Sequence, residues 1–75
     1  MILYFENIYR RTRREIGRPT TIEEAYEMIT SFLKEHNFVS YYSRHWVNPD
    51  NRHERKIDVG SHTEFFVLYN EDEWE

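Results

Sequence analysis

Five arginines lie within nine residues near the N-terminus and form the most prominent charged group of the sequence. They are Arg10, Arg11, Arg13, Arg14 and Arg18. Guanidinium groups bind phosphate oxygens through paired hydrogen bonds, so this group has the chemistry of a nucleic-acid contact. A solvated surface whose arginines pair with carboxylates such as Glu6 and Glu15 explains the same pattern. A contact with a protein partner is the third interpretation.

Acidic side chains dominate the rest of the chain. Residues 1–20 carry a net charge of +3 and residues 21–75 carry −7, so the whole chain has a net charge of −4. Sequence-independent phosphate binding generally needs a basic domain, which makes nucleic-acid binding the alternative hypothesis. Carboxylates can instead imitate a phosphate backbone and occupy a cationic groove of another protein. The carboxylates expected in such an interface are Glu54, Asp58, Glu64, Glu71, Asp72 and Glu73. The plainer alternative is that they only keep the domain soluble.

The sequence shows no metal-binding or catalytic motif. It has no cysteine, and its four histidines, at positions 36, 45, 53 and 62, lack the spacing typical of metal ligands. Ser61 and His62 follow Asp58 closely, but neighbours on a tight turn point in different directions, and Gly60 marks such a turn. The sequence therefore predicts no metal site, no cofactor and no enzymatic activity.

The composition limits the size of the structure that positions these residues. The 75 residues, of which 39% are hydrophobic and 17% aromatic, suffice for one small domain over 1–75 and not for a second core. Without cysteine there is no disulfide, so aromatic side chains are expected to stabilise the core. The lack of cysteine and of a long apolar run favours a soluble, cytoplasmic protein.

Two helices are expected in the N-terminal half. Apolar residues spaced by three or four predict a helix over about 3–16, which Gly17 and Pro19 end. A short strand at 1–5 is the structural alternative. A second helix is expected over about 22–36, because a capping box precedes an apolar stripe. The capping residues are Thr21 and Glu24, and the stripe is Ile22, Ala25, Ile29, Phe32 and Leu33.

Three strands are expected after the second helix. β-Branched and aromatic residues between turn formers predict strands at about 38–47, 53–59 and 63–70. The acidic tail 71–75 is expected to fray, as chain termini usually do. Together these elements predict an α+β fold, with two N-terminal helices packed on a three-stranded antiparallel β-meander.

The turn lengths predict which side chains of the sheet face the helices. A four-residue first turn places Trp46 opposite His53, and a three-residue second turn places Ile57 opposite Phe65. The expected core face is Tyr42, Trp46, Ile57, Val59, Phe65, Val67 and Tyr69. The opposite face then exposes Tyr41, Phe66 and Leu68, the expected apolar centre of a partner-binding surface. In the alternative arrangement the first helix covers these three residues.

The segment from Lys56 to Phe66 reads KIDVGSHTEFF and belongs to a small, acidic chain without cysteine. In these features the chain resembles the small accessory proteins of bacteriophages and prophages, many of which inhibit a host protein by binding it. The resemblance implies a host protein that handles nucleic acid as the partner, for example a defence nuclease blocked by an anti-CRISPR-like inhibitor. It carries over no functional residue.

Three hypotheses for the function follow. The leading one is a non-enzymatic protein-binding module that occludes a nucleic-acid-handling partner by shape and charge. The first alternative is a nucleic-acid-binding domain that uses the arginine-rich helix. The second alternative is a small structural protein that dimerises through an aromatic strand edge or face.

Overall fold

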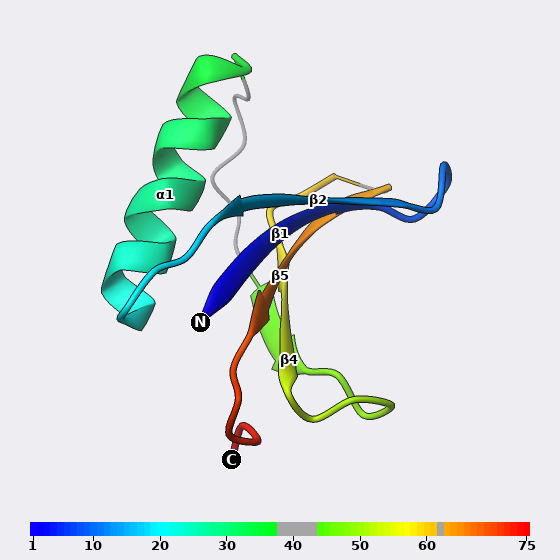
Figure 1. Ribbon diagram of the computed structural model, residues 1–75. Coiled ribbons are helices and arrows are strands. Elements are labelled where there is room, and N and C mark those ends of the chain that lie inside the picture. Colours follow the sequence, from blue (N-terminus) through cyan, green and yellow to red (C-terminus); the bar gives the residue numbers. More distant parts are fainter. Residues whose placement is uncertain (38–43, 62) are drawn as a thin grey trace.

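The computed structural model describes residues 1–37, 44–61 and 63–75 (Figure 1). These residues contain one helix and five strands. The strands form a single antiparallel sheet in the order β2-β1-β5-β4-β3. The elements are β1 (Ile2–Asn7), β2 (Thr12–Gly17), α1 (Ile22–Glu35), β3 (Arg44–Val47), β4 (Glu54–Asp58) and β5 (Glu64–Tyr69). The expected fold of two helices on a three-stranded meander is therefore wrong. In Figure 1, α1 stands on one side of the sheet, and the turn between β1 and β2 lies at the far end from it.

The N-terminal segment forms a β-hairpin where a helix over 3–16 was expected. β1 pairs with β2 on one side and with β5 on the other, so it lies inside the sheet. Its alternate residues Leu3 and Phe5 pack against the core. This spacing of two residues is the period of a strand, in which successive side chains point to opposite faces. Pairing on both edges outweighs the local helical preference, because most helical stability in proteins comes from tertiary packing. The alternative of a strand near 1–5 is the correct one.

The helix expected over 22–36 is present as α1. The Thr21 hydroxyl accepts a hydrogen bond from the Glu24 amide at 3.1 Å, which caps the first turn. The Glu24 carboxylate accepts from the Thr20 hydroxyl at 2.8 Å and so does not complete the capping box on Thr21. The residues that α1 buries against the sheet are Ala25, Ile29, Phe32 and Leu33. The apolar stripe of the sequence therefore identifies the buried face of the helix.

The register between β4 and β5 differs from the expected one by one residue. Ile57 lies opposite Phe66, and not opposite Phe65. The connecting turn is longer than three residues. Within it, the Ser61 hydroxyl accepts hydrogen bonds from the Thr63 and Glu64 amides (3.4 and 3.2 Å), and Glu64 is the first residue of β5. A shift of one residue moves every side chain of a strand to the other face. Phe66 and Leu68 consequently lie in the core, while Phe65, Val67 and Tyr69 lie on the face away from α1.

The register between β3 and β4 also differs from the expected one. Trp46 lies opposite Lys56, and not opposite His53, because the connection runs from Asn48 to His53. Three backbone hydrogen bonds close it: Asn48 N to Glu54 O, Asn51 N to Asn48 O, and Glu54 N to Asn51 O. Trp46 therefore belongs to the face away from α1. Tyr41 and Tyr42 lie outside the described residues.

The core fills the space between α1 and one face of the sheet. Its buried residues are Leu3, Ala25, Ile29, Phe32, Leu33, Ile57, Val59, Phe66 and Leu68. The Phe32 ring lies 4.7 Å from the Phe5 ring and 5.5 Å from the Phe66 ring, the latter in an edge-to-face arrangement that stabilises aromatic pairs. No helix among the described residues has the length and apolar character that crossing a membrane requires.

Candidate functional site

The C-terminal segment is held against the sheet and is not frayed as expected. The Asn70 amide donates to the His53 carbonyl at 2.8 Å, and the Trp74 amide donates to the Arg52 carbonyl at 2.9 Å. The Trp74 indole donates to the His53 and Leu68 carbonyls at 3.1 and 3.3 Å. Trp74 also packs against the core, and the Arg55 guanidinium lies over its ring. One aromatic residue thus fixes a tail that its charge alone would leave in solvent.

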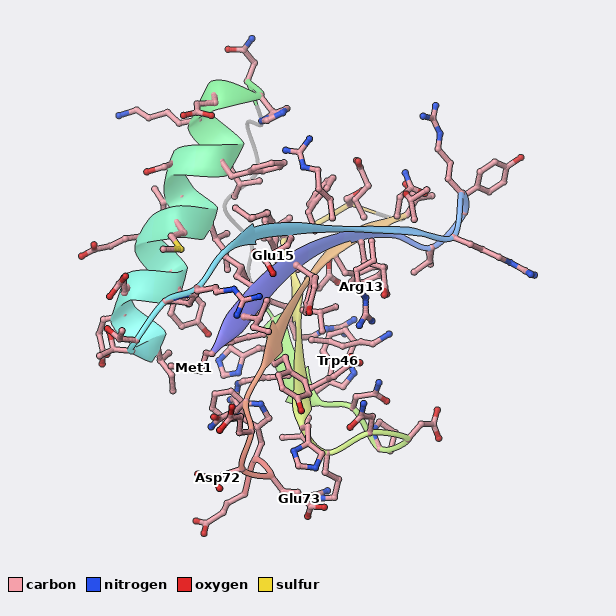
Figure 2. All side chains as sticks on the ribbon, viewed as in Figure 1. Met1, Arg13, Glu15, Trp46, Asp72 and Glu73 are labelled. Carbon is pink, nitrogen blue, oxygen red and sulfur yellow. The ribbon has the colours of Figure 1, made fainter. Side chains whose placement is uncertain are left out.

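Three exposed carboxylates lie between these two anchors. Glu71, Asp72 and Glu73 are exposed and form what we call the acidic loop. Figure 2 shows Asp72 and Glu73 beside the C-terminal end of the chain, away from Arg13 and Glu15. Both ends of the loop are hydrogen-bonded to the turn before β4, so the backbone that carries these three carboxylates is held in place.

The other predicted interface carboxylates do not join the acidic loop in one free surface. Glu54 is only 7% exposed and pairs with Arg13 at 2.6 Å. Asp58 pairs with Arg44 at 3.5 Å and accepts a hydrogen bond from the Gly60 amide at 2.8 Å. Glu64 is half-buried. The structure therefore separates the acidic strand residues, which serve the fold, from the exposed acidic loop.

The register of β5 shows that two of the three apolar residues predicted for the partner surface lie in the core. Phe66 and Leu68 are fully buried beneath α1 and cannot contact a partner in the folded protein. Tyr41, the third of them, lies outside the described residues. The sequence could not show this, because the one extra residue in the turn before β5 has no strong local signature.

A network of ion pairs covers the middle of the face away from α1. Arg13 binds Glu6 and Glu54, each at 2.6 Å, and Lys56 lies 3.7 Å from Glu6. Val67, whose neighbours across the strands are Tyr4 and Lys56, has no exposed surface although it faces away from the core. Long charged side chains here shield an apolar residue from water with their stems.

The network shifts the pKa values of its two strongest partners. The hydrogen bond to Glu54 raises the pKa of Arg13, although burial acts in the opposite direction. Burial acts to raise the pKa of Glu54, but the hydrogen bond and charge of Arg13, with the amide of Asn48 and the charge of Lys56, lower it below its ordinary value. Both groups are thus held in their charged forms.

The five arginines do not form one basic surface. Arg13 is committed to carboxylates, the Arg18 guanidinium lies 3.1 Å from Glu15, and the Arg14 guanidinium lies over the Phe32 ring. Arg10 and Arg11 occupy the turn between β1 and β2, and no ion pair among the described residues involves either of them. Alternation along β2 explains why Arg13 and Arg14 separate, because successive side chains of a strand point to opposite faces.

The turn between β1 and β2 exposes apolar surface beside these two arginines. Ile8 is 47% exposed and Tyr9 is 84% exposed. The turn is held by the Asn7 side chain, which accepts a hydrogen bond from the Arg10 amide at 2.9 Å. Arg11 has a φ of 54°, in the left-handed region that glycine and asparagine normally occupy. The sequence did not predict this turn, because the helix expected over 3–16 includes the turn residues.

A groove separates α1 from the end of β2. Ile16, Met28 and Phe32 supply its apolar lining, and Ser31 lies on its helical side. Its volume is about 410 Å³, and its acidic lining residues are Glu24, Glu27 and Glu35. The amphipathic pattern of α1 is a signal for the buried face only, so the sequence does not indicate this groove.

Among residues 1–37, 44–61 and 63–75, no group of three or more metal-ligating side chains lies close enough together to hold a metal ion. The described histidines are spread over different elements, with His36 after α1, His45 in β3 and His53 before β4. No protein-family model, no curated protein and no solved structure matches the chain.

Proposed function

We propose that the chain is a protein-binding module without catalytic activity, which occludes a cationic groove of a nucleic-acid-handling host protein. In this proposal the acidic loop enters the groove and takes the place of a phosphate backbone. The partner then loses access to nucleic acid, as it would with a phage-type, anti-CRISPR-like inhibitor.

The observation that carries the proposal is the anchoring of the acidic loop. Glu71, Asp72 and Glu73 lie between Asn70 and Trp74, which are both hydrogen-bonded to the turn before β4. A frayed tail would lose conformational entropy on binding, whereas a fixed loop has already lost it on folding. Complementary charge also accelerates and orients the encounter with a cationic partner.

The test uses the tagged protein as bait in a nuclease-treated bacterial lysate, followed by binding measurements with the purified partner. In the loop variant, Glu71→Gln, Asp72→Asn and Glu73→Gln remove three charges, and we expect the partner's affinity to fall at least about tenfold. The control variant, Glu15→Gln, Glu23→Gln and Asp50→Asn, removes the same charge from other exposed sites and should bind as the parent does. Unchanged binding by the loop variant contradicts the proposal.

Nucleic-acid binding remains the second candidate because Arg10 and Arg11 lie beside the exposed Tyr9. Bases stack on aromatic rings while guanidinium groups bind phosphate. If the bait instead retains nucleic acid before nuclease treatment, binding should weaken steeply with salt and disappear in the variant Arg10→Glu, Arg11→Glu. Light scattering over a concentration series tests dimerisation, the third hypothesis.

A further inference from the structure

β2 forms one edge of the sheet and offers unpaired backbone groups. Its ladder joins it to β1 alone, and no backbone hydrogen bond among the described residues links it to another strand or loop. Thr12, Arg13, Arg14 and Glu15 are all exposed. An exposed edge of this kind is the template on which an added strand forms hydrogen bonds.

The groove between β2 and α1 lies beside this edge. The register of β1 and β2 shifts between Leu3 and Tyr4, which leaves Ile16 without a partner opposite it and turns it toward the groove. α1 approaches closely at the end of the strand, since a Cβ on Gly17 would lie 3.0 Å from the Met28 sulfur. The edge and an apolar lining are thus combined in one site.

The charges of the groove indicate the chemistry of its occupant. Glu27 and Glu35 are exposed on the helical side, while the carboxylate of Glu24 is already bonded to Thr20. On the strand side, Arg14 lies over the Phe32 ring at 5.6 Å. The free charges that α1 presents to the groove, Glu27 and Glu35, are negative, so the side chains that complement them are Lys and Arg.

We propose that this groove receives an extended basic segment of a partner protein, which adds a sixth strand to the edge of β2. An apolar side chain of the segment packs against Ile16, Met28 and Phe32. Lysine or arginine side chains two residues away, on the same face of the added strand, pair with Glu27 and Glu35. This site is separate from the acidic loop and does not depend on it.

The probe is a positional-scanning library of acetylated and amidated octapeptides, tested on the full chain at low salt. We expect enrichment of peptides with one large apolar residue and Lys or Arg two positions from it. In the best peptide, N-methylation of alternate residues on one edge should abolish binding, whereas N-methylation on the other edge should leave it intact. Failure to enrich any peptide, or indifference to N-methylation on both edges, overturns strand addition.

Protein variants locate the site. Glu27→Lys with Glu35→Lys should weaken peptide binding at least about tenfold, because two attractions become repulsions. Ser31→Trp should block the groove by filling it, and Lys34→Trp, on an exposed helical position outside the groove lining, is the matched control. Glu71→Lys with Glu73→Lys makes the same change of charge in the acidic loop and should leave peptide binding unchanged. If the variant with Glu71→Lys and Glu73→Lys no longer binds the peptide while the variant with Glu27→Lys and Glu35→Lys still does, the assignment of the peptide to the groove is wrong. This conclusion holds whatever partner the lysate experiment identifies.

Discussion

At the scale of single residues, Glu54 is the clearest case of a carboxylate that serves the fold. It is nearly buried, and it receives hydrogen bonds from Arg13 and Asn48. Sequence reasoning assigned Glu54 to a partner surface because it could identify the charge but not its partner, which lies 41 positions earlier in the chain. Long-range ion pairs of this kind leave no periodic signal in a sequence.

This pairing predicts a pH-dependent contribution to stability. The pKa of Glu54 lies below its ordinary value of 4.5, so the carboxylate stabilises the fold above that pH and the contribution is lost as the pH falls through the lowered pKa. Glu54→Gln should cost about 1–2 kcal/mol of unfolding free energy near neutral pH, and this difference should shrink in acid. Urea unfolding at about pH 7 and about pH 3 measures both effects.

The control for this prediction is Glu15→Gln, which removes the exposed pair with Arg18. It should cost no more than about 0.5 kcal/mol, because exposed ion pairs are weak. A Glu54→Gln variant whose difference from the parent is equal at both pH values would show that the Glu54 carboxylate does not contribute through its charge.

At the scale of elements, the turn of the β1–β2 hairpin contains a residue with an unfavourable backbone conformation. Arg11 occupies a left-handed conformation that disfavours residues with a Cβ by about 1–2 kcal/mol. Four exposed residues with two large apolar side chains form the turn, where Gly or Asn would relieve the strain.

Arg11→Gly should therefore stabilise the protein. The gain is expected to be about 0.5–1 kcal/mol, since relief of strain exceeds the extra entropy that glycine adds to the unfolded chain. Thermal and urea unfolding of the variant measure it. Arg11→Ala keeps the Cβ and is the matched control, expected to gain nothing. A destabilised glycine variant would mean that the arginine side chain itself holds the turn.

At the scale of the whole molecule, Trp74 joins the C-terminal segment to the sheet and the core. Its backbone and indole groups bond to Arg52, His53 and Leu68, which come from two other parts of the chain. The acidic loop is consequently part of the folded structure, and Asp72 and Glu73 lie at the end of the molecule opposite Arg13 and Glu15 (Figure 2). The separation of this acidic end from the arginines of the β1–β2 turn makes the molecule electrostatically polar.

Trp74→Ala should release the acidic loop. We expect a loss of about 1–3 kcal/mol in stability, because a half-buried aromatic ring leaves the core, and faster hydrogen exchange at the Asn70 and Trp74 positions. Trp46→Ala is the control, since Trp46 lies on the opposite face and forms no hydrogen bond to the tail among the described residues. Its variant should lose stability while the amide protection of the tail persists. Equal protection in both variants would show that Trp74 does not anchor the loop.

The sequence by itself determined the elements whose signals are local. The Thr21 cap and the apolar stripe of α1 lie within a few turns of one another. β-Branched and aromatic residues between turn formers indicate β4 and β5 without reference to the rest of the chain. The acidity of residues 71–73 and the lack of a metal motif are likewise properties of neighbouring residues.

Only the tertiary structure decided how these elements combine. The apolar residues between positions 3 and 16 have helical spacing, but the pairing of residues 2–7 with β5, more than fifty positions later, selects a strand there. A single residue in the turn before β5 decides that Phe66 faces α1 and Phe65 does not. The acidic loop is fixed, and the groove beside β2 exists, because segments far apart in the chain meet in space. Contacts between distant residues have no period in the sequence, which is the physical reason that they emerge only in the folded molecule.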